Sequence, residues 1–323
     1  MKIQGKCFYQ FTRSFSDRVG STTSFVWASY CGLWQIHKSA NALSALSEKP
    51  QWKKIEDYLV GEVPGRGGID LHDISSKTWA SHQASYSDFI LTQGAILFED
   101  WSKSLAEMTL VPGKKIKAET FQFASGATSN KWTNWSALDV PGIHTGSSFI
   151  KNEVQPALLT AYATNISSLD VLLNWYRFYK ELRNSIAHHG GVIRQENVDA
   201  YETASLGSLA SAGIKRNFSG VKPILGGKIN LELHDAVLFL AIIQRLSFAF
   251  DAKYCHTNQA EANLIARLRG ALADSPAPYE LTAERKASWI KKFLMHRGGI
   301  TPSSLPTAEA WLKSNNVLTI KVI

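Results

Sequence analysis

Cysteine is scarce in this sequence. The chain has three cysteines in 323 residues, Cys7, Cys31 and Cys255, and no two of them form a CxxC pair. An odd number of widely spaced thiols argues against a disulfide framework, and their spacing argues against a zinc knuckle. We therefore expect a protein of a reducing compartment, the cytoplasm, with no metal and no other cofactor.

Long apolar runs are also absent. Residues 1–14 are polar and aromatic and lack the apolar core of a signal peptide. The most apolar stretch, residues 236–250, is interrupted by Gln244 and Arg245 and is shorter than a membrane span. These absences predict a soluble protein that does not use a membrane as a partner.

Acidic residues are too few to balance the basic ones. The sequence has 35 Lys and Arg against 27 Asp and Glu, which gives a net charge of +8. Its 45% hydrophobic and 19% charged residues are typical of a globular protein and exclude wholesale disorder. The basic surplus favours a polyanionic partner such as RNA, although many basic proteins bind no nucleic acid.

Helical periodicity is what the sequence has in abundance. Apolar residues recur every three or four positions in segments that are separated by proline and glycine. The predicted helices span residues 21–46, 52–60, 86–110, 167–189, 234–254, 259–272, 284–295 and 307–313. We therefore predict an all-α fold, a helical bundle with the very apolar helix at 234–254 in its centre.

The segments between these helices are predicted to be loops. The longest are residues 61–68, 113–151 and 194–227. Residues 229–233 alternate apolar and polar side chains, which fits either a short strand or a loop. We divide the chain into an N-terminal helical extension (1–75), a helical domain (76–256) and a C-terminal helical tail (257–323).

The helix predicted at residues 167–189 carries the most informative side chains. Ser168 is a plausible N-cap, and Gly190 and Gly191 are predicted to end the helix. Its apolar seam consists of Leu172, Trp175, Tyr179, Leu182 and Ile186. The neighbouring stripe is polar and largely basic, with Arg177, Lys180, Asn184 and His188.

Arg183, Asn184 and His188 are the residue types that RNA cleavage without a metal requires. The reaction needs a base for the 2'-hydroxyl proton, an acid for the leaving 5'-oxygen and a cation for the charge on phosphorus. Histidine exchanges protons near neutral pH, arginine binds phosphate through two coplanar donors, and asparagine can orient either group. Residues five apart are separated by about 140° on a helix, so Arg183 and His188 converge only if His188 lies where the helix ends.

The pattern Arg183-Asn184-xxx-His188, late in an amphipathic helix, resembles the RxxxxH motif of the HEPN superfamily (higher eukaryotes and prokaryotes nucleotide-binding domain). The similarity extends to the helices predicted at 86–110 and 234–254. It implies a helical bundle that forms a homodimer with two motifs in one composite cleft. Many members are RNases that leave a 2',3'-cyclic phosphate and a 5'-hydroxyl and act as toxins or antiviral defence effectors.

For this chain the resemblance implies an RNA substrate and catalytic roles for Arg183, Asn184 and His188. Arg177, Lys180 and His189 are the candidate substrate-binding residues. The spacing from Arg183 to His189 also satisfies a looser form of the motif, and we choose His188 as the catalytic histidine. An antitoxin or another defence-system protein is a possible partner.

Simpler interpretations exist for most of these residues. Arg183 can be a surface arginine, His188 a C-terminal cap of its helix, and Arg177 and Lys180 part of a solvated helix face. Elsewhere, Cys255 beside His256 is read as a core cysteine and a surface histidine, and Asp70, His72 and Asp73 as a polar turn. Trp132 and Trp135, near Lys131, can stack on unpaired bases, but loop tryptophans more often cover the core.

Three functions remain open at this point. The first is an endoribonuclease of bacterial defence or a toxin. The second is a module that binds RNA or a nucleotide without chemistry. The third is a helical protein-interaction partner that binds no nucleic acid.

Overall fold

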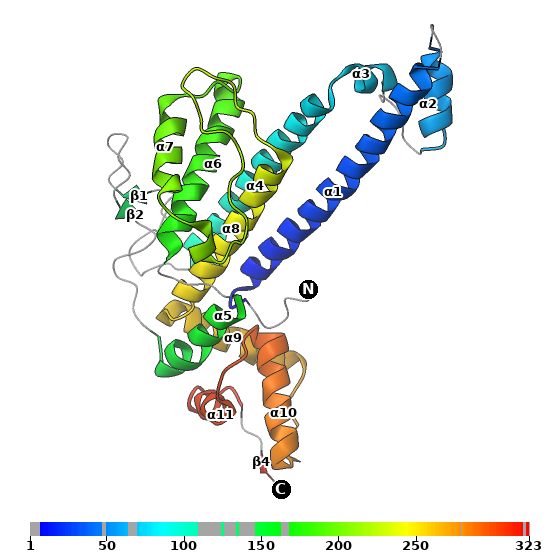
Figure 1. Ribbon diagram of the computed structural model, residues 1–323. Coiled ribbons are helices and arrows are strands. Elements are labelled where there is room, and N and C mark those ends of the chain that lie inside the picture. Colours follow the sequence, from blue (N-terminus) through cyan, green and yellow to red (C-terminus); the bar gives the residue numbers. More distant parts are fainter. Residues whose placement is uncertain are drawn as a thin grey trace.

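The computed structural model describes residues 7–46, 50–63, 70–108, 124–125, 134–135, 146–162, 168–278, 280–318 and 321–322. The fold is all-α, as the periodicity predicts (Figure 1). Its α-helices are α1 (Gln10–Ser44), α2 (Trp52–Val60), α3 (Leu71–Ser76), α4 (Trp79–Met108), α5 (Gln155–Tyr162), α6 (Leu169–His189), α7 (Gln195–Ser205), α8 (Leu233–Tyr254), α9 (Asn258–Asp274), α10 (Ala283–Phe293) and α11 (Leu305–Ser314).

Shorter elements connect these helices. Ile150–Val154 and Leu294–Gly298 are π-helical turns, and Leu209–Ala212 is a 3-10 turn. Strand β1 (Ala124–Ser125) pairs antiparallel with β2 (Asn134–Trp135), and β3 (Glu280–Leu281) pairs in parallel with β4 (Lys321–Val322).

Helices α4 and α8 form the spine of the bundle. They pack closely at Gly94 of α4, where an added Cβ would lie 2.8 Å from the Phe239 ring of α8. Helix α1 packs on one side of this pair and α6 on the other. In Figure 1, α1 and α4 run side by side into an arm that carries α2 and α3 at its far end, while α9, α10 and α11 form the lower part of the molecule.

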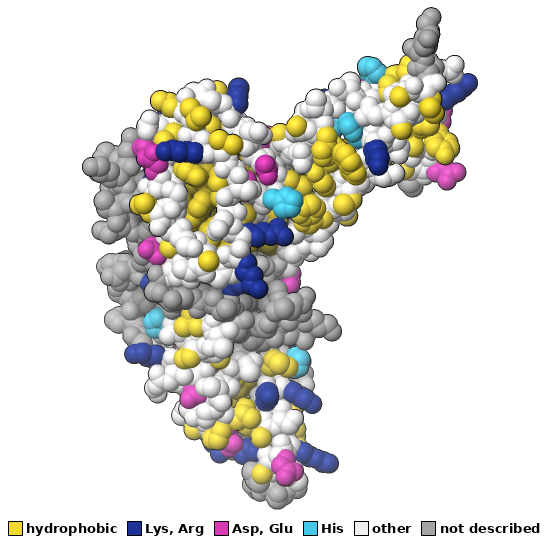
Figure 2. All heavy atoms as spheres, viewed as in Figure 1, with side chains coloured by type: hydrophobic (Ala, Val, Ile, Leu, Met, Phe, Trp, Pro, Cys, Tyr) yellow, Lys and Arg dark blue, Asp and Glu magenta, His cyan; other side chains and the backbone are white. Residues whose placement is uncertain are grey.

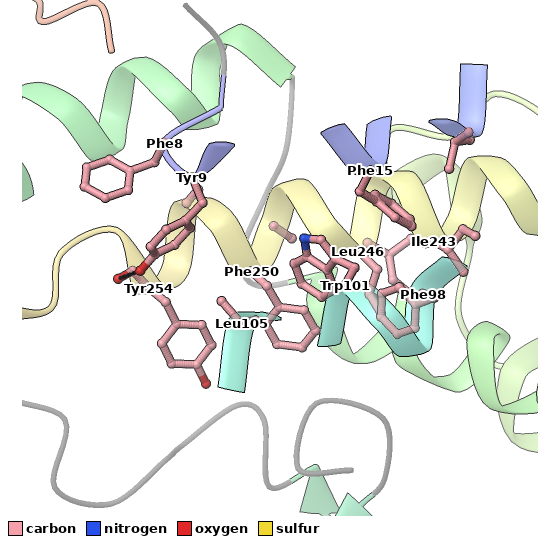
Figure 3. Close-up of a cluster of buried hydrophobic side chains, with 14 of the residues drawn as sticks. Phe8, Tyr9, Phe15, Phe98, Trp101, Leu105, Ile243, Leu246, Phe250 and Tyr254 are labelled. Carbon is pink, nitrogen blue, oxygen red and sulfur yellow. Dashed lines mark hydrogen bonds between the residues drawn. The ribbon is translucent and has the colours of Figure 1, made fainter. Parts of the chain in front are cut away.

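Aromatic side chains from three helices meet where α1, α4 and α8 cross (Figure 3). Trp101 of α4 stacks on Phe98 with ring centroids 5.2 Å apart and contacts Phe250 of α8 at 6.0 Å. Its indole N–H donates a hydrogen bond to the Thr12 hydroxyl of α1 at 3.1 Å. A buried indole N–H needs a hydrogen-bond acceptor. The hydrogen bond to Thr12 therefore fixes α1 on α4, while the Trp101 ring fills the core.

Helix α8 is the core helix that the sequence predicts, and its bounds, Leu233–Tyr254, differ by one residue from the predicted 234–254. Among the described residues it is the one helix long and apolar enough to cross a membrane, with 22 residues. Within the protein, 72% of its most apolar window is buried. Its apolar surface is thus covered by neighbouring helices, which is the usual place of such a helix in a bundle.

Several predicted boundaries shift in the structure. Helix α1 starts at Gln10 instead of residue 21, and α4 starts at Trp79 instead of residue 86. The prediction of a polar turn at Asp70 was wrong, because the Asp70 carboxylate accepts a hydrogen bond from the Asp73 N–H at 3.0 Å and caps α3. Most of the loop predicted at residues 113–151, including Lys131 and Trp132, lies outside the described residues, as does the side chain of Trp135.

Helix α7 is the larger correction. It lies inside the segment predicted to be a loop, and it was missed because its buried side chains are small or polar: Asn197, Ala200 and Ala204. Residues 229–233 form no strand; an isolated bridge joins Val192 to Lys228 just before them. Buried residues of all three predicted units, such as Phe15, Phe98 and Leu312, belong to one core cluster. The division into three folding units stays a prediction.

A buried carboxylate holds the start of α1. Asp251 of α8 is 1% exposed, and its two oxygens accept hydrogen bonds from the Phe8 N–H at 2.7 Å and the Tyr9 N–H at 3.1 Å. Burial raises the pKa of Asp251 to about 6, although these hydrogen bonds and Arg267 act in the opposite direction. Asp251 therefore ties the N-terminal segment to the core helix at an electrostatic cost near neutral pH.

We predict that Asp251→Asn gains stability relative to the wild type as the pH rises. The folded-state pKa of Asp251, about 6, lies above the ordinary value of 3.8. Its contribution to the free energy of unfolding is therefore fully present below the ordinary pKa and is lost as the pH rises through about 6. A neutral amide loses nothing in this range. The variant's free energy of unfolding, relative to the wild type, should rise by about 1 kcal/mol between pH of about 5 and about 7.5.

Urea unfolding followed by circular dichroism measures this difference. Asp17→Asn, at an exposed position of α1, controls for the loss of one negative charge. A difference between Asp251→Asn and wild type that is the same at both pH values would contradict the prediction.

Candidate active site

The predicted site lies at the C-terminal end of α6, and this helix ends where the glycines predict. Gly190 and Gly191 adopt positive φ angles of 60° and 74°, and the Gly191 N–H donates a hydrogen bond to the Ser185 carbonyl at 3.0 Å. This is the left-handed cap that glycine forms without steric penalty. His188 and His189 therefore occupy the last turn, where both side chains are exposed.

The buried face of α6 matches the prediction closely. Leu172, Trp175, Tyr179 and Leu182 are all at most 6% exposed, and Ile186 is half-buried near the helix end. This packing fixes the rotation of α6 about its axis. It consequently decides which way each polar residue of the motif points.

Arg183 and Asn184 are half-buried and contact each other. The Arg183 guanidinium donates a hydrogen bond from Nη1 to the Asn184 side-chain oxygen at 3.3 Å. Asn184 also hydrogen-bonds the Glu181 carboxylate. Burial raises the pKa of Glu181, and the hydrogen bond from Asn184 is one of the smaller effects that lower it. Asn184 thus links a cation and a carboxylate on adjoining faces of the helix.

Arg183 and His188 do not lie on the same face of α6. Arg183 follows Tyr176 and Lys180 on the face toward α4, where the Lys180 ammonium lies 3.9 Å from the Glu99 carboxylate. His188 follows Asn184 by one turn, on the face that adjoins α7. The hydrogen bond brings the Arg183 guanidinium to Asn184, the side chain that precedes His188 by one helical turn.

The electrostatic surroundings of Arg183 include a buried phenol. Burial, and next the Glu99 carboxylate, raise the pKa of Tyr176, whereas Arg183 lowers it. The Tyr176 hydroxyl has no hydrogen-bond partner within the described part of the chain. Arg183 therefore lies at the border between an aromatic interior and the exposed end of the helix.

The predicted substrate-binding cations are less accessible than the motif. The Lys180 side chain is 12% exposed beside Glu99, and Arg177 is 5% exposed and interacts with Glu181 and with Asp199 of α7. Burial lowers the pKa of Arg177 to about 10. Arg177 packs between α6 and α7, so it contributes little to the exposed surface at the end of α6.

The structure distinguishes the two candidate histidines. The His189 Nε2 atom lies 2.8 Å from Nη1 of Arg194, and because arginine only donates, this nitrogen is an acceptor. The His188 ring contacts the His189 ring at a centroid distance of 6.3 Å and makes no hydrogen bond within the described residues. The proton-accepting nitrogen of His189 is thus occupied, whereas the exposed His188 ring has no hydrogen-bond partner among the described residues.

Two residues beside the site were missed by sequence reasoning. Lys228 donates a hydrogen bond from its ammonium to the Gly190 carbonyl at 2.7 Å, and Arg194 approaches Glu196 at 3.6 Å. The chain around Lys228 runs beside the end of α6, since the Ile229 N–H donates to the Gly191 carbonyl at 2.8 Å. No local signal connects Lys228 with a helix end 38 residues earlier, so only the tertiary structure reveals it.

An apolar pocket of about 150 Å³ adjoins this end of α6. Phe178 and Leu182 of α6 form one wall, Phe218 and Ile229 line the opposite side, and the Lys228 side chain also borders it. Such a pocket can accept a flat apolar group next to the Lys228 side chain. It is a part of the site that no motif indicated.

Cys255 is the core cysteine that the simpler interpretation expected, whereas His256 is less exposed than the surface histidine that it expected. Cys255 is fully buried and His256 is half-buried, with the His256 ring 3.1 Å from the Gln155 amide nitrogen. Burial, followed by Lys151 and Lys253, lowers the pKa of His256. In the portion of the chain that is described, no three His, Cys, Asp or Glu side chains group as a metal site would need.

The chain was compared with protein-family models, with curated proteins and with solved structures. None of the three comparisons found a match. The HEPN resemblance therefore rests on the motif of α6 and stays a proposal.

Asn197 of α7 holds the segment after the motif in place. Its buried side-chain oxygen accepts hydrogen bonds from the Ser185 hydroxyl at 2.9 Å and from the Arg194 N–H at 2.8 Å. We predict that Asn197→Ala lowers the free energy of unfolding by about 1–3 kcal/mol, because both donors lose their buried acceptor. Asn217→Ala, at an exposed position, should change it by less than about 0.5 kcal/mol. Equal losses in the two variants, measured by urea unfolding, would refute this assignment.

Proposed function

We propose that the protein is a metal-independent endoribonuclease of HEPN type, with Arg183, Asn184 and His188 as its catalytic residues. The observation that carries the proposal is the end of α6, where the exposed His188 imidazole follows, by one helical turn, the asparagine that hydrogen-bonds the Arg183 guanidinium. The net charge of +8 supports a polyanionic substrate. The pocket at the same helix end offers room for a base.

In the proposed reaction His188 accepts the proton of a ribose 2'-hydroxyl. The resulting oxygen attacks the adjacent phosphorus, the bond to the 5'-oxygen breaks, and a proton is donated to that oxygen. Arg183, held by Asn184, would neutralise the charge that develops on the phosphoryl oxygens. The products would be a 2',3'-cyclic phosphate and a 5'-hydroxyl.

The proton for the leaving oxygen would come from a second copy of the chain. In one chain His188 takes the 2'-hydroxyl proton, and the neighbouring His189 ring is engaged with the Arg194 guanidinium through Nε2. A homodimer that joins two α6 ends would supply a second His188 and a second Arg183. Lys228 would add positive charge to this cleft, and His189 would position Arg194 beside it.

A biological role follows from the proposed chemistry. An RNase that needs no metal or cofactor must be kept inactive in the cell that makes it, so we propose a bacterial toxin or antiviral defence effector. It would act in the cytoplasm, with an antitoxin or another defence protein as its control.

The second candidate function is an RNA-binding module without chemistry. It is favoured by one observation, the placement of Arg183 and His188 on neighbouring faces of a single α6. In that case the same cations would hold the phosphates and no bond would break. The two functions differ in their products.

We predict that His188→Ala lowers the rate of RNA cleavage in EDTA by on the order of 10²–10⁴-fold, because it removes the proton acceptor. Arg183→Ala should lower the rate by on the order of 10²-fold or more, because it removes the charge on the transition-state phosphate. The measurement is gel analysis of a labelled RNA together with detection of the cyclic phosphate.

His72→Ala is the control, since it removes an exposed imidazole of α3, in the arm away from the end of α6. It should retain most of the cleavage activity. Full activity in both His188→Ala and Arg183→Ala would end the enzyme proposal, and RNA binding by the wild type without any cyclic product would favour the binding module.

A further inference from the structure

Helix α10 and the π-helical turn after it carry an unusual share of the positive charge. Residues 283–298 include five Lys or Arg and one acidic residue, Glu284. Lys286 is buried and pairs with Glu309 of α11 at 2.7 Å, so its charge is neutralised internally. The remaining cations, among them Lys292 and Arg297, are exposed.

Five residues of α10 and its π-helical turn line a pocket of about 460 Å³ together with Ala271 and Ser275 at the end of α9. The cationic or titratable residues at its wall are Lys292, His296 and Arg297, and no carboxylate of the described residues lines it. Figure 2 shows basic side chains and a histidine gathered on the lower part of the molecule, where Figure 1 places α10. Lys292 and Arg297 form no ion pair within the described residues, unlike Lys286 and Lys313, which share Glu309.

An aromatic pair lies inside the same pocket. Trp289 stacks on Phe293, with centroids 4.8 Å apart and an interplanar angle of 15°. Phe293 is 8% exposed and Trp289 is half-buried, so the pair is fixed by the core. An indole has two faces, and Phe293 covers one; no other ring of the described residues stacks on the second.

Helical geometry places the charges beside this platform. Lys292 and His296 follow Trp289 by three and seven positions, so they share its face of the helix. The π-helical turn Leu294–Gly298 widens the end of the helix, and Gly299 closes it with a φ of 70°. Arg297 therefore leaves the helix at the rim of the pocket.

We propose that this pocket binds single-stranded RNA, with a base stacked on Trp289 and the backbone phosphates on Lys292, His296 and Arg297. Aromatic platforms flanked by cations are what unpaired nucleotides use, whatever their sequence. A membrane surface fits less well, because the aromatic rings are recessed, and interfacial binding needs protruding apolar groups. The choice of RNA over DNA rests on the function proposed above.

This surface is separate from the motif of α6. Figure 1 places α10 in the lower part of the molecule and α6 above it, so the pocket would hold a strand without contacting Arg183 or His188. Its role would be to raise the affinity for unpaired RNA, and cleavage would take place elsewhere.

The test uses a short, fluorescently labelled single-stranded RNA whose 2'-hydroxyls are methylated, so that binding is measured without cleavage. Trp289→Leu, which keeps an apolar side chain against Phe293, should weaken binding about tenfold by fluorescence anisotropy. Trp289→Phe should restore most of the affinity, because it retains an aromatic face.

Charge is tested with the double variant Lys292→Glu, Arg297→Glu. It should weaken binding, and the slope of log affinity against log salt should fall by roughly 0.7 for each phosphate that the protein no longer neutralises. The control is Lys53→Glu, Lys54→Glu on α2, which makes the same change in net charge at two exposed positions in the distant arm. It should change the affinity much less.

Three results would overturn the proposal. The first is an equal loss of RNA affinity in the two double variants, and the second is unchanged RNA binding in Trp289→Leu. The third is a Lys292→Glu, Arg297→Glu variant that binds anionic vesicles more weakly than the wild type but binds RNA equally well. Cleavage assays of His188→Ala are independent of these measurements. The α10 pocket can therefore fail while the RNase proposal stands, and the converse holds as well.

Discussion

The apolar surface of α8 is the constraint on which the rest of this fold depends. Leu238, Phe239, Leu240 and Ile243 are each at most 3% exposed, and helical geometry spreads them over about 200° around the helix axis. A helix with so wide an apolar surface must be covered by several neighbouring helices. Helices α1, α4, α5 and α6 provide that cover, and Gly94 lets α4 approach closely enough to do so.

The position of the candidate active site follows from that packing. Once Tyr179 and Leu182 are buried against the core, α6 has no freedom to rotate, and its polar residues take fixed directions. Arg183 is then half-buried beside α4, and His188 is left exposed in the last turn. A rigid helix with an exposed end is a precise support for two side chains that, in the proposed function, act on one phosphate.

The packing of the helices also decides which charged side chains lie beside a partner of opposite charge. Near α6, cations lie close to carboxylates: Lys180 to Glu99, Arg194 to Glu196, and Arg177 to Glu181 and Asp199. In the α10 pocket the cations have no carboxylate of the described residues beside them. A phosphate at α6 must therefore compete with protein carboxylates, whereas a phosphate at α10 meets uncompensated charge. Differences of this kind are invisible in the net charge.

The sequence by itself determined the helical class, the core helix, the seam of α6 and its glycine cap, because apolar spacing and glycine conformation are local properties. Three features had no strong local signal. Helix α7 buries small and polar residues, Arg177 has the look of a surface residue, and Lys228 lies far along the chain from the helix end that it caps. The pairing of His189 with Arg194 is equally invisible in the spacing of the residues. These features were decided by the tertiary structure, because burial and partner choice depend on which helix packs against which face, and spacing within one segment does not contain that information.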